Sequence, residues 1–247
     1  MRIFEGMKKL LPFFFLLLLC IWLPPSCANR SGDPADSIVW TADSLPGILE
    51  TCGAPQRIST PAGAALHFDG EDDGLFLDAV PVAGMEALTL ELVFRQESGS
   101  AFEQRFLHIG TMDRRILFET RALPDGTWYF DAFVNLGTPD PTPEDPRPQR
   151  RSAVLIDETL RHPADRWHTL ALTASADGLV SYVDGIEQCR NPLAFSALIP
   201  AEGCTSLGVR QNRVCWFKGD IFKLRVTPRV LDPADFLQDH VILNGDA

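Results

Sequence analysis

Apolar and polar residues alternate along several short stretches of the chain, the pattern of a β-strand with one buried face. The clearest stretch is 88–95, in which Leu88, Leu90, Leu92 and Phe94 fall on one side. Other stretches with strand character are 116–121, 127–134, 167–174, 179–183, 206–210 and 220–226. Many short strands without helical periodicity between them predict an all-β fold in which two antiparallel sheets pack together.

Asp-Gly pairs separate several of these stretches, at 125–126, 177–178 and 184–185. An Asp-Gly pair between two strand-like runs predicts a tight hairpin, because both residues tolerate positive φ. The one helical signal lies near the C-terminus. There Asp232 can cap a short helix over 231–236.

The segment 138–151 interrupts the strand pattern with prolines placed among charged residues. Proline has no N–H to donate to a β-ladder, so this segment is predicted to be an exposed loop of polyproline character. A solvated insertion is the simpler interpretation, and a recognition element is the alternative.

The first 28 residues have the layout of an export signal. Basic residues precede an apolar run over 10–23 that is shorter than the ~20 residues of a membrane-spanning helix. Cleavage after Ala28 predicts a soluble secreted chain, whereas the stretch that ends in Cys27 resembles a lipobox and predicts lipidation of Cys27. An uncleaved N-terminal anchor is a third alternative, and all three place the protein outside the cytoplasm.

The remainder is predicted to be a polar leader over 29–37 and a single domain over 38–247. A hydrophobic content of 45% is enough for a sizeable core. The net charge is −11, which argues against a nucleic-acid partner, because phosphates require a basic surface. Membrane contact is expected only through the N-terminal lipid or the uncleaved anchor.

Four cysteines follow the export signal: Cys52, Cys189, Cys204 and Cys215. An even number of cysteines in an exported chain predicts disulfides, and four cysteines allow three pairings. The favoured pairs are Cys189–Cys204, which closes one loop, and Cys52–Cys215, which ties the N-terminal strand region to the C-terminal one. A zinc site is weakly supported, because no Cys-x-x-Cys pair is present and the histidines are scattered.

Four motifs, in order, resemble the laminin-G-like, concanavalin A-like jelly-roll family. They are 65–74 (an "FDG-x-DD" turn), 88–95 (an "FTLE-x-W" strand), 166–172 with 182–185 ("WHHVA … YVDG"), and 207–226 with 231–236 (the family's ending). The resemblance implies a two-sheet antiparallel jelly-roll β-sandwich, concanavalin A-like, with one short C-terminal helix. Within it, Trp167 is expected to anchor the core and His168 to lie on the surface.

Members of this family mostly bind glycans or proteins, or serve as modules beside catalytic domains. The resemblance therefore implies an exported, non-catalytic binding module with a glycan as its expected partner. A cell-surface protein partner or a structural role is the alternative.

Some family members bind calcium near their loops. Asp69, Glu71, Asp72 and Asp73 form a dense carboxylate cluster, and carboxylate oxygens on a turn suit Ca²⁺. No cofactor is required by the sequence, and a hydrated acidic turn is the alternative interpretation of this cluster.

Sugar binding needs aromatic rings beside polar groups that hydrogen-bond hydroxyls. Strand alternation places Tyr129 and Asp131 on the face opposite the core-like Trp128, so these two are candidates. Trp216, in a loop-like stretch, and Tyr182 are the other candidates.

Catalysis is the less favoured alternative. Glycosidases on this fold use two carboxylates that flank the scissile bond, commonly within a Glu-x-Asp-x-x-Glu pattern that this chain lacks. Glu91, Glu119 and Asp131 occupy polar strand positions and could converge, although a solvated sheet face explains them more simply. No nucleophile elbow or zinc-protease motif occurs.

Overall fold

The computed structural model describes residues 33–246. The predicted signal peptide 1–28, its lipidation site Cys27 and the first part of the polar leader lie outside the described residues. Within 33–246, no helix has the length and apolar character needed to cross a membrane.

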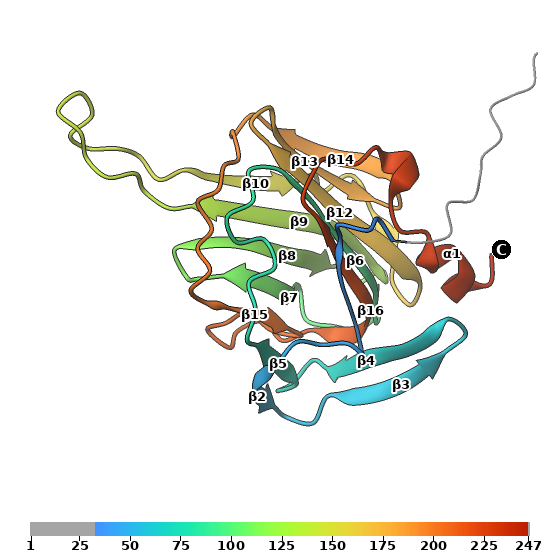
Figure 1. Ribbon diagram of the computed structural model, residues 1–247. Coiled ribbons are helices and arrows are strands. Elements are labelled where there is room, and N and C mark those ends of the chain that lie inside the picture. The colour runs from blue at the N-terminus through green and yellow to red at the C-terminus, as the bar shows by residue number, and fades with distance from the viewer. Residues whose placement is uncertain (1–32, 247) are drawn as a thin grey trace, which may run out of the picture. The chain divides into compact units, whose positions relative to one another are not determined.

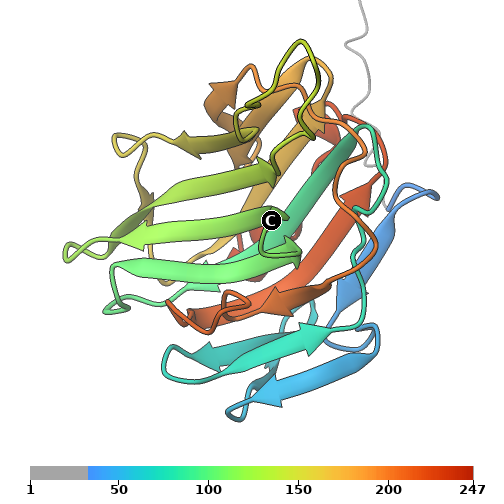
Figure 2. The same cartoon turned by 90° about the vertical axis from the view of Figure 1, so that its left-hand side faces the viewer.

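Two antiparallel sheets face each other, as Figures 1 and 2 show from two sides. Sheet A consists of β1 (Ile38–Thr41), β3 (Gln56–Thr60), β4 (Gly63–Asp69), β6 (Leu88–Gln96), β12 (Trp167–Ser175), β13 (Gly178–Val183), β14 (Ile186–Asn191) and β16 (Lys218–Thr227). Sheet B consists of β2 (Ile48–Cys52), β5 (Gly74–Leu77), β7 (Glu103–Gly110), β8 (Arg114–Ala122), β9 (Thr127–Leu136), β10 (Ser152–Ile156), β11 (His162–Pro163) and β15 (Cys204–Leu207).

Strands distant in sequence are neighbours in both sheets. The order in sheet A is β14-β13-β12-β6-β16-β4-β3, with β1 beside β16. The order in sheet B is β10-β9-β8-β7-β15-β5-β2, with β11 beside β9. This crossed order of paired antiparallel strands confirms the predicted jelly-roll sandwich.

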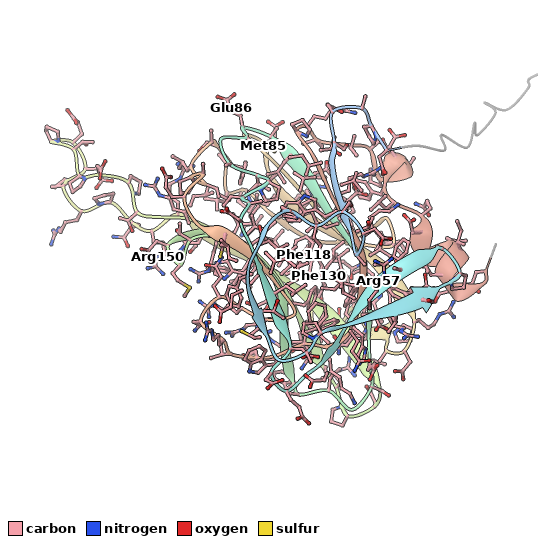
Figure 3. All side chains as sticks on the ribbon, turned by 60° about the horizontal axis from the view of Figure 1, so that its bottom comes forward. Arg57, Met85, Glu86, Phe118, Phe130 and Arg150 are labelled. Carbon is pink, nitrogen blue, oxygen red and sulfur yellow. The ribbon has the colours of Figure 1, made fainter. Side chains whose placement is uncertain are left out.

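The predicted apolar faces meet between the sheets. Leu88, Leu90, Leu92 and Phe94 are fully buried in one core cluster with residues of sheet B. Figure 3 labels Phe118 and Phe130 of β8 and β9 in this core. Their rings pack edge to face with centroids 5.1 Å apart. The period-two pattern therefore predicted the inward faces of these strands correctly.

The predicted hairpin turns are present, and one predicted strand is shorter than expected. Asp184 and Gly185 both have positive φ, 51° and 78°, as the tight turn between β13 and β14 requires. The strand expected over 206–210 ends at Leu207. Gly208 there adopts φ 79° and lies so close to Phe68 that a Cβ would be 2.2 Å from the ring, so the chain turns out of the sheet.

The C-terminal segment covers the outer face of sheet A. The expected helix over 231–236 is a single 3-10 turn, Pro233–Asp235, capped by Asp232, and the α-helix α1 (Asp239–Asn244) follows it. Apolar residues of this segment form two clusters with sheet A. The first contains Leu231, Phe236, Ala171, Val180 and Tyr182, and the second contains Leu237, Leu243, Trp167, Val93, Phe222 and Ala65.

The predicted disulfides are wrong for this structure, in which all four cysteines are free thiols. Cys189 lies on β14, at an edge of sheet A, whereas Cys204 lies on β15, inside sheet B. The thiols of Cys52 and Cys215 face different carboxylates, Glu50 at 3.7 Å and Glu103 at 3.2 Å. The cysteine count predicted pairing, but none of these four cysteines is paired in the structure.

Candidate functional site

The outer face of sheet B carries the densest set of polar and aromatic side chains. Because the core residues of β7, β8 and β9 point inward, their alternate residues point outward: Arg105, His108, Arg115, Leu117, Glu119, Arg121, Tyr129, Asp131, Phe133 and Asn135. The C-terminal segment packs on sheet A. The loop after β15 lies over part of the outer face of sheet B, where Gln211 bonds to His108 and to the Gly110 carbonyl. Figure 1 shows α1 beside sheet A.

Arginines and carboxylates alternate across the middle of this face. Arg105, Glu119 and Asp131 lie side by side on β7, β8 and β9. The Nε of Arg105 donates to the Glu119 carboxylate at 3.2 Å, and Arg121 contacts both Glu119, at 3.1 Å, and Asp131, at 2.5 Å. Arg105 also contacts Glu103, at 2.8 Å. The long side chains therefore lie flat over the sheet and are held by charge-assisted hydrogen bonds.

Burial changes the acidity of Asp131. Its exposed fraction is 4%, and burial raises its pKa to about 6, against the lowering effect of Arg121. The neighbouring Glu119 adds to the rise, because two like charges lie close together. The aspartate is consequently close to its titration point at neutral pH.

The contribution of Asp131 to stability is expected to fall as the pH rises from about 4 to about 6, whereas the buried His108 contributes in the opposite direction over the same range. The folded chain binds the Asp131 proton more tightly than the unfolded chain does. Ionisation of this group therefore leaves the free energy of unfolding unchanged below pH 4 and lowers it by about 3 kcal/mol above pH 6. Asp131→Asn cannot ionise and should remove most of that slope. The measurement is urea unfolding at pH 4 and pH 7, with exposed Asp140→Asn as control. Equal slopes in the two variants would disprove this assignment.

All four buried side-chain atoms that lack a hydrogen-bond partner within 33–246 lie on or beside this face. They are Arg115 Nε, Asp131 Oδ1, Asn135 Nδ2 and Arg210 Nε. The first three belong to β8 and β9, and Arg210 follows β15. Buried polar atoms are nearly always paired, so four unpaired atoms on one face indicate that a polar ligand or ordered water completes it.

Two of the four sequence-predicted ligand residues come together here, and a third lies on the loop after β15. Tyr129 and Asp131 share the outer face of β9, and Tyr129 lies opposite Arg121. Trp216 is half-buried in the loop before β16, and Cys215 next to it binds the Arg105 backbone N–H through its carbonyl, at 3.0 Å. The Trp216 ring lies near Gly74 of β5, two strands away from β7, and so outside the charged row of Arg105, Glu119 and Asp131.

Tyr182 and Glu91 do not join this site. Tyr182 lies on the outer face of sheet A, where its ring packs edge to face on Phe236 with centroids 5.1 Å apart. Glu91 is fully buried on that same side and binds Arg225. Of the three carboxylates considered for catalysis, only Glu119 and Asp131 therefore lie together.

The predicted calcium cluster is partly assembled. Asp69, Asp72 and Asp73 each place one carboxylate oxygen within 4.8 Å of the others, and Glu71 is not in this group. Hydrogen bonds from backbone N–H groups already reach two of the three carboxylates: Asp73 accepts from Ala54 at 2.6 Å, and Asp69 accepts from Glu71 at 2.8 Å. Three oxygens on one turn suit a hard cation, so the calcium site stays a prediction.

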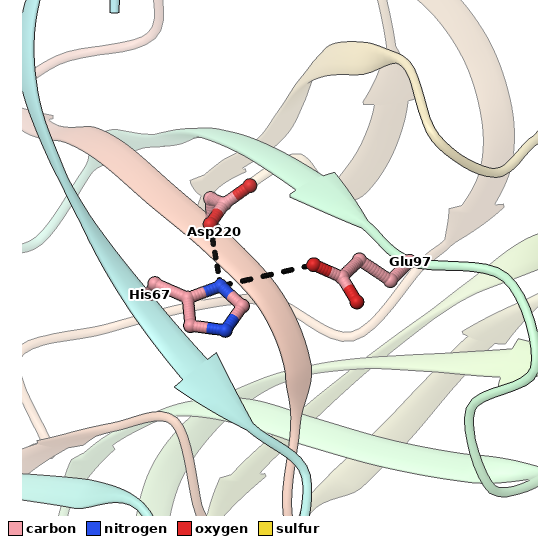
Figure 4. Close-up of side chains that lie close together, drawn as sticks. All are labelled: His67, Glu97 and Asp220. Carbon is pink, nitrogen blue, oxygen red and sulfur yellow. Dashed lines mark hydrogen bonds and ion pairs between the residues drawn. The ribbon is translucent and has the colours of Figure 1, made fainter. Parts of the chain in front are cut away.

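A second cluster, on sheet A, was not predicted from the sequence. His67 Nδ1 lies 2.9 Å from Asp220 and 3.8 Å from Glu97 (Figure 4). Arg95 binds the other oxygen of Asp220 at 2.7 Å, and Lys218 lies 3.6 Å from Glu97. These cations already neutralise both carboxylates, so the geometry does not require a metal ion.

The order and architecture of the strands agree with the comparisons to known proteins. A model of the concanavalin A-like lectin/glucanases superfamily matches residues 69–235. The chain belongs to this superfamily. No curated protein matches it.

Solved structures share the fold of this superfamily member at low sequence identity. The sialidase of Trypanosoma rangeli, in complex with a 2,3-difluoro-KDN, is 13% identical with a TM-score of 0.55, and the match covers 91% of this chain and 36% of that one. The receptor binding domain of botulinum neurotoxin C/D mosaic serotype is 10% identical with a TM-score of 0.53, covering 85% and 46%. Tailspike protein 2 of the Escherichia coli O157:H7 bacteriophage CAB120 is 13% identical with a TM-score of 0.51, covering 77% and 27%.

Proposed function

We propose that this protein is an exported, non-catalytic module that binds a glycan on the outer face of sheet B. The observation that carries the proposal is the set of unpaired buried polar atoms on that face, at Arg115, Asp131, Asn135 and Arg210. A saccharide has hydroxyls that both donate and accept hydrogen bonds, so it can satisfy the three N–H donors and the carboxylate oxygen of this set.

Aromatic side chains support the choice of a sugar. Phe133 and Trp216 are half-buried; Phe133 lies beside the Arg115 guanidinium, and Trp216 lies near Gly74 of β5. An apolar ring next to fixed polar groups is the arrangement that accommodates the apolar face of a sugar and orients its hydroxyls. Membership of a lectin and glucanase superfamily supports a saccharide ligand as well.

The site favours binding over cleavage. A glycosidase needs a carboxylic acid that reaches the glycosidic oxygen and a second carboxylate that attacks or activates water. Glu119 and Asp131 are 5% and 4% exposed, and Arg121 binds both carboxylates. Arg121 thus engages both carboxylates, so neither is placed as a free acid or nucleophile. Both hold Arg121, and Glu119 also holds Arg105.

An apolar strip beside the site favours a protein partner as the second candidate. Val154 and Ile156 of the edge strand β10 are 50% and 39% exposed, and they lie opposite Phe133 and Asp131 of β9. Exposed apolar groups with a polar border are typical of a protein contact. In the glycan proposal, this strip is the rim against which a longer saccharide rests.

A glycan array probed with the full chain, with and without EDTA, tests the proposal. We expect saccharide hits in buffer without chelator. Hits that disappear with EDTA would support calcium at Asp69, Asp72 and Asp73. A blank array would contradict glycan binding and favour the protein partner. Release of reducing sugar from a bound glycan would contradict the non-catalytic assignment.

A further inference from the structure

Unpaired positive charge gathers at one end of sheet B, although the chain is acidic overall. Residues 33–246 contain sixteen arginines, of which ten form ion pairs. The other six belong to the start of β8, to the loop between β9 and β10, and to the residues after β15: Arg114, Arg115, Arg147, Arg150, Arg151 and Arg210. In a chain of net charge −11, this grouping leaves a local positive surface.

Three hydrogen-bond donors without acceptors occupy the centre of this surface. Asn135 lies directly opposite Arg115, and the Nδ2 of Asn135 and the Nε of Arg115 are both unpaired. Gly110 lies on the other side of Arg115, and its carbonyl accepts a hydrogen bond from Gln211 at 3.0 Å. The chain therefore brings Arg210, whose Nε is also unpaired, to the same place.

Described carboxylates compensate these charges only in part: Glu119 and Asp113 act on Arg115 from a distance, and no ion pair with Arg115 or Arg210 is formed within 33–246. Burial is the main cause that lowers the pKa of Arg115, and the charges of Arg210 and Arg150 contribute to the same shift. Burial likewise lowers the pKa of the adjacent His108 to about 4, so this imidazole is neutral and adds no charge. The Arg115 guanidinium rests over the Phe133 ring, 5.0 Å from its centroid, which fixes its position.

A hollow of about 360 Å³ lies at the same end of sheet B, although Arg115, Asn135 and Arg210 do not line it. Arg114 and Arg150 line it together with Gly137, Thr138 and the carboxylate-bearing Asp113. Figure 3 shows Arg150 at the base of the protruding loop. The exposed loop also carries Asp140, Glu144 and Asp145, none of which lines this hollow.

We propose that the glycan is acidic and that its carboxylate or sulfate group binds at Arg115, Asn135 and Arg210. Guanidinium groups match planar oxyanions with paired, charge-assisted hydrogen bonds, and the amide of Asn135 supplies a third donor. Asp131 and Asn135 are four residues apart on β9, a span of about 13 Å, so the charged row and this subsite can engage one oligosaccharide. This inference rests on the proposed glycan-binding function and specifies its ligand.

Calorimetric titration of the full chain with two matched pairs of polymers tests the inference. The pairs are polygalacturonate with its methyl ester, and dextran sulfate with dextran. We expect an acidic polymer to bind at least about tenfold more tightly than its neutral counterpart, with affinity that decreases as salt is raised. The pair that shows the difference identifies carboxylate or sulfate as the recognised group.

Variants locate the subsite. Arg115→Gln and Arg210→Gln should each weaken the acidic polymer about tenfold, and Asp113→Asn should strengthen it by removing a repulsive carboxylate. Arg57→Gln, on β3 of sheet A (Figure 3), is the control that should leave affinity unchanged. Arg115 is buried, so the half-buried Arg210 provides a test that does not depend on the folding of the Arg115 variant.

Equal affinities for charged and neutral polymers would overturn the acidic-glycan inference and leave glycan binding in place. No binding to either acidic polymer would also overturn it, whatever the array shows. A blank array in addition would remove the proposed function itself. Equal effects of Arg210→Gln and Arg57→Gln would show that the subsite is elsewhere.

Discussion

Replacement of Glu91 by alanine is expected to lower the free energy of unfolding by about 3–5 kcal/mol. Glu91 accepts hydrogen bonds from Arg225 at 2.6 Å and 3.0 Å and from the Leu237 backbone N–H at 2.7 Å. Its exposed fraction is 0%, and that of Arg225 is 4%. Burial raises the pKa of Glu91 against the lowering effect of Arg225. The substitution removes the carboxylate partner of the buried Arg225 guanidinium. It also removes the hydrogen bond that holds the C-terminal segment at the Leu237 backbone N–H.

A matched exposed pair provides the control. Glu187 binds Arg190 at 2.7 Å, but both side chains are largely exposed, at 45% and 65%. Water and salt screen such a pair, so Glu187→Ala should cost under about 1 kcal/mol. Urea unfolding of both variants measures the difference. Similar losses for Glu91→Ala and Glu187→Ala would contradict the anchoring role of the buried pair.

Phe94→Ala is the second substitution with a large expected effect, a loss of about 3–5 kcal/mol. The Phe94 ring is fully buried and lies against aromatic rings of sheet B and of the loop before β16. Its centroid lies 5.0 Å from that of Phe106, 5.2 Å from that of Trp128 and 6.1 Å from that of Phe217. Alanine there loses the buried apolar surface and leaves a cavity that these rigid rings cannot fill.

Phe102→Ala is the control for this substitution. Phe102 is 54% exposed, in the loop before β7, so its truncation should change stability by no more than about 0.5 kcal/mol. Thermal and urea unfolding of the two variants provides the comparison. A loss below about 1 kcal/mol for Phe94→Ala would contradict a core in which the aromatic rings of the two sheets interlock.

Strand alternation predicted which side chains face the core, because its period of two is a local property. Leu90 and Leu224 were expected to point inward, and they are 0% and 2% exposed. The same rule placed Tyr129 and Asp131 on the outer face of β9. Local patterns sufficed for these residues, since each strand has one face in the sandwich.

The pattern failed where both faces of a strand are covered. Trp167 is buried as expected, but on the outer face of sheet A beneath α1, with Arg95 5.3 Å from its ring. His168, expected on the surface, points inward against Trp128 and binds the Asp184 carboxylate at 2.7 Å. Alternation separates the two faces, but it does not show that a C-terminal segment will cover one of them.

The charged network of the site depends on register and could not be predicted from spacing. Arg105 meets Glu119 because β7 and β8 pair with a bulge between Arg105 and Leu107. The charge of Arg210 acts on Arg115 because β15, which precedes Arg210, lies beside β7. The number of cysteines likewise does not show which thiols the folded chain brings together, and none of the four is paired.

The most direct test of glycan binding on sheet B is a titration of the isotope-labelled full chain with the strongest array hit, followed by NMR. We predict that the amide signals of Arg121 and Asp131 and the indole N–H signal of Trp216 shift with saturation. The indole signal of Trp167, beneath α1, should stay in place as an internal control. Shifts at Trp167 and Tyr182 with unchanged signals on β8 and β9 would contradict the account.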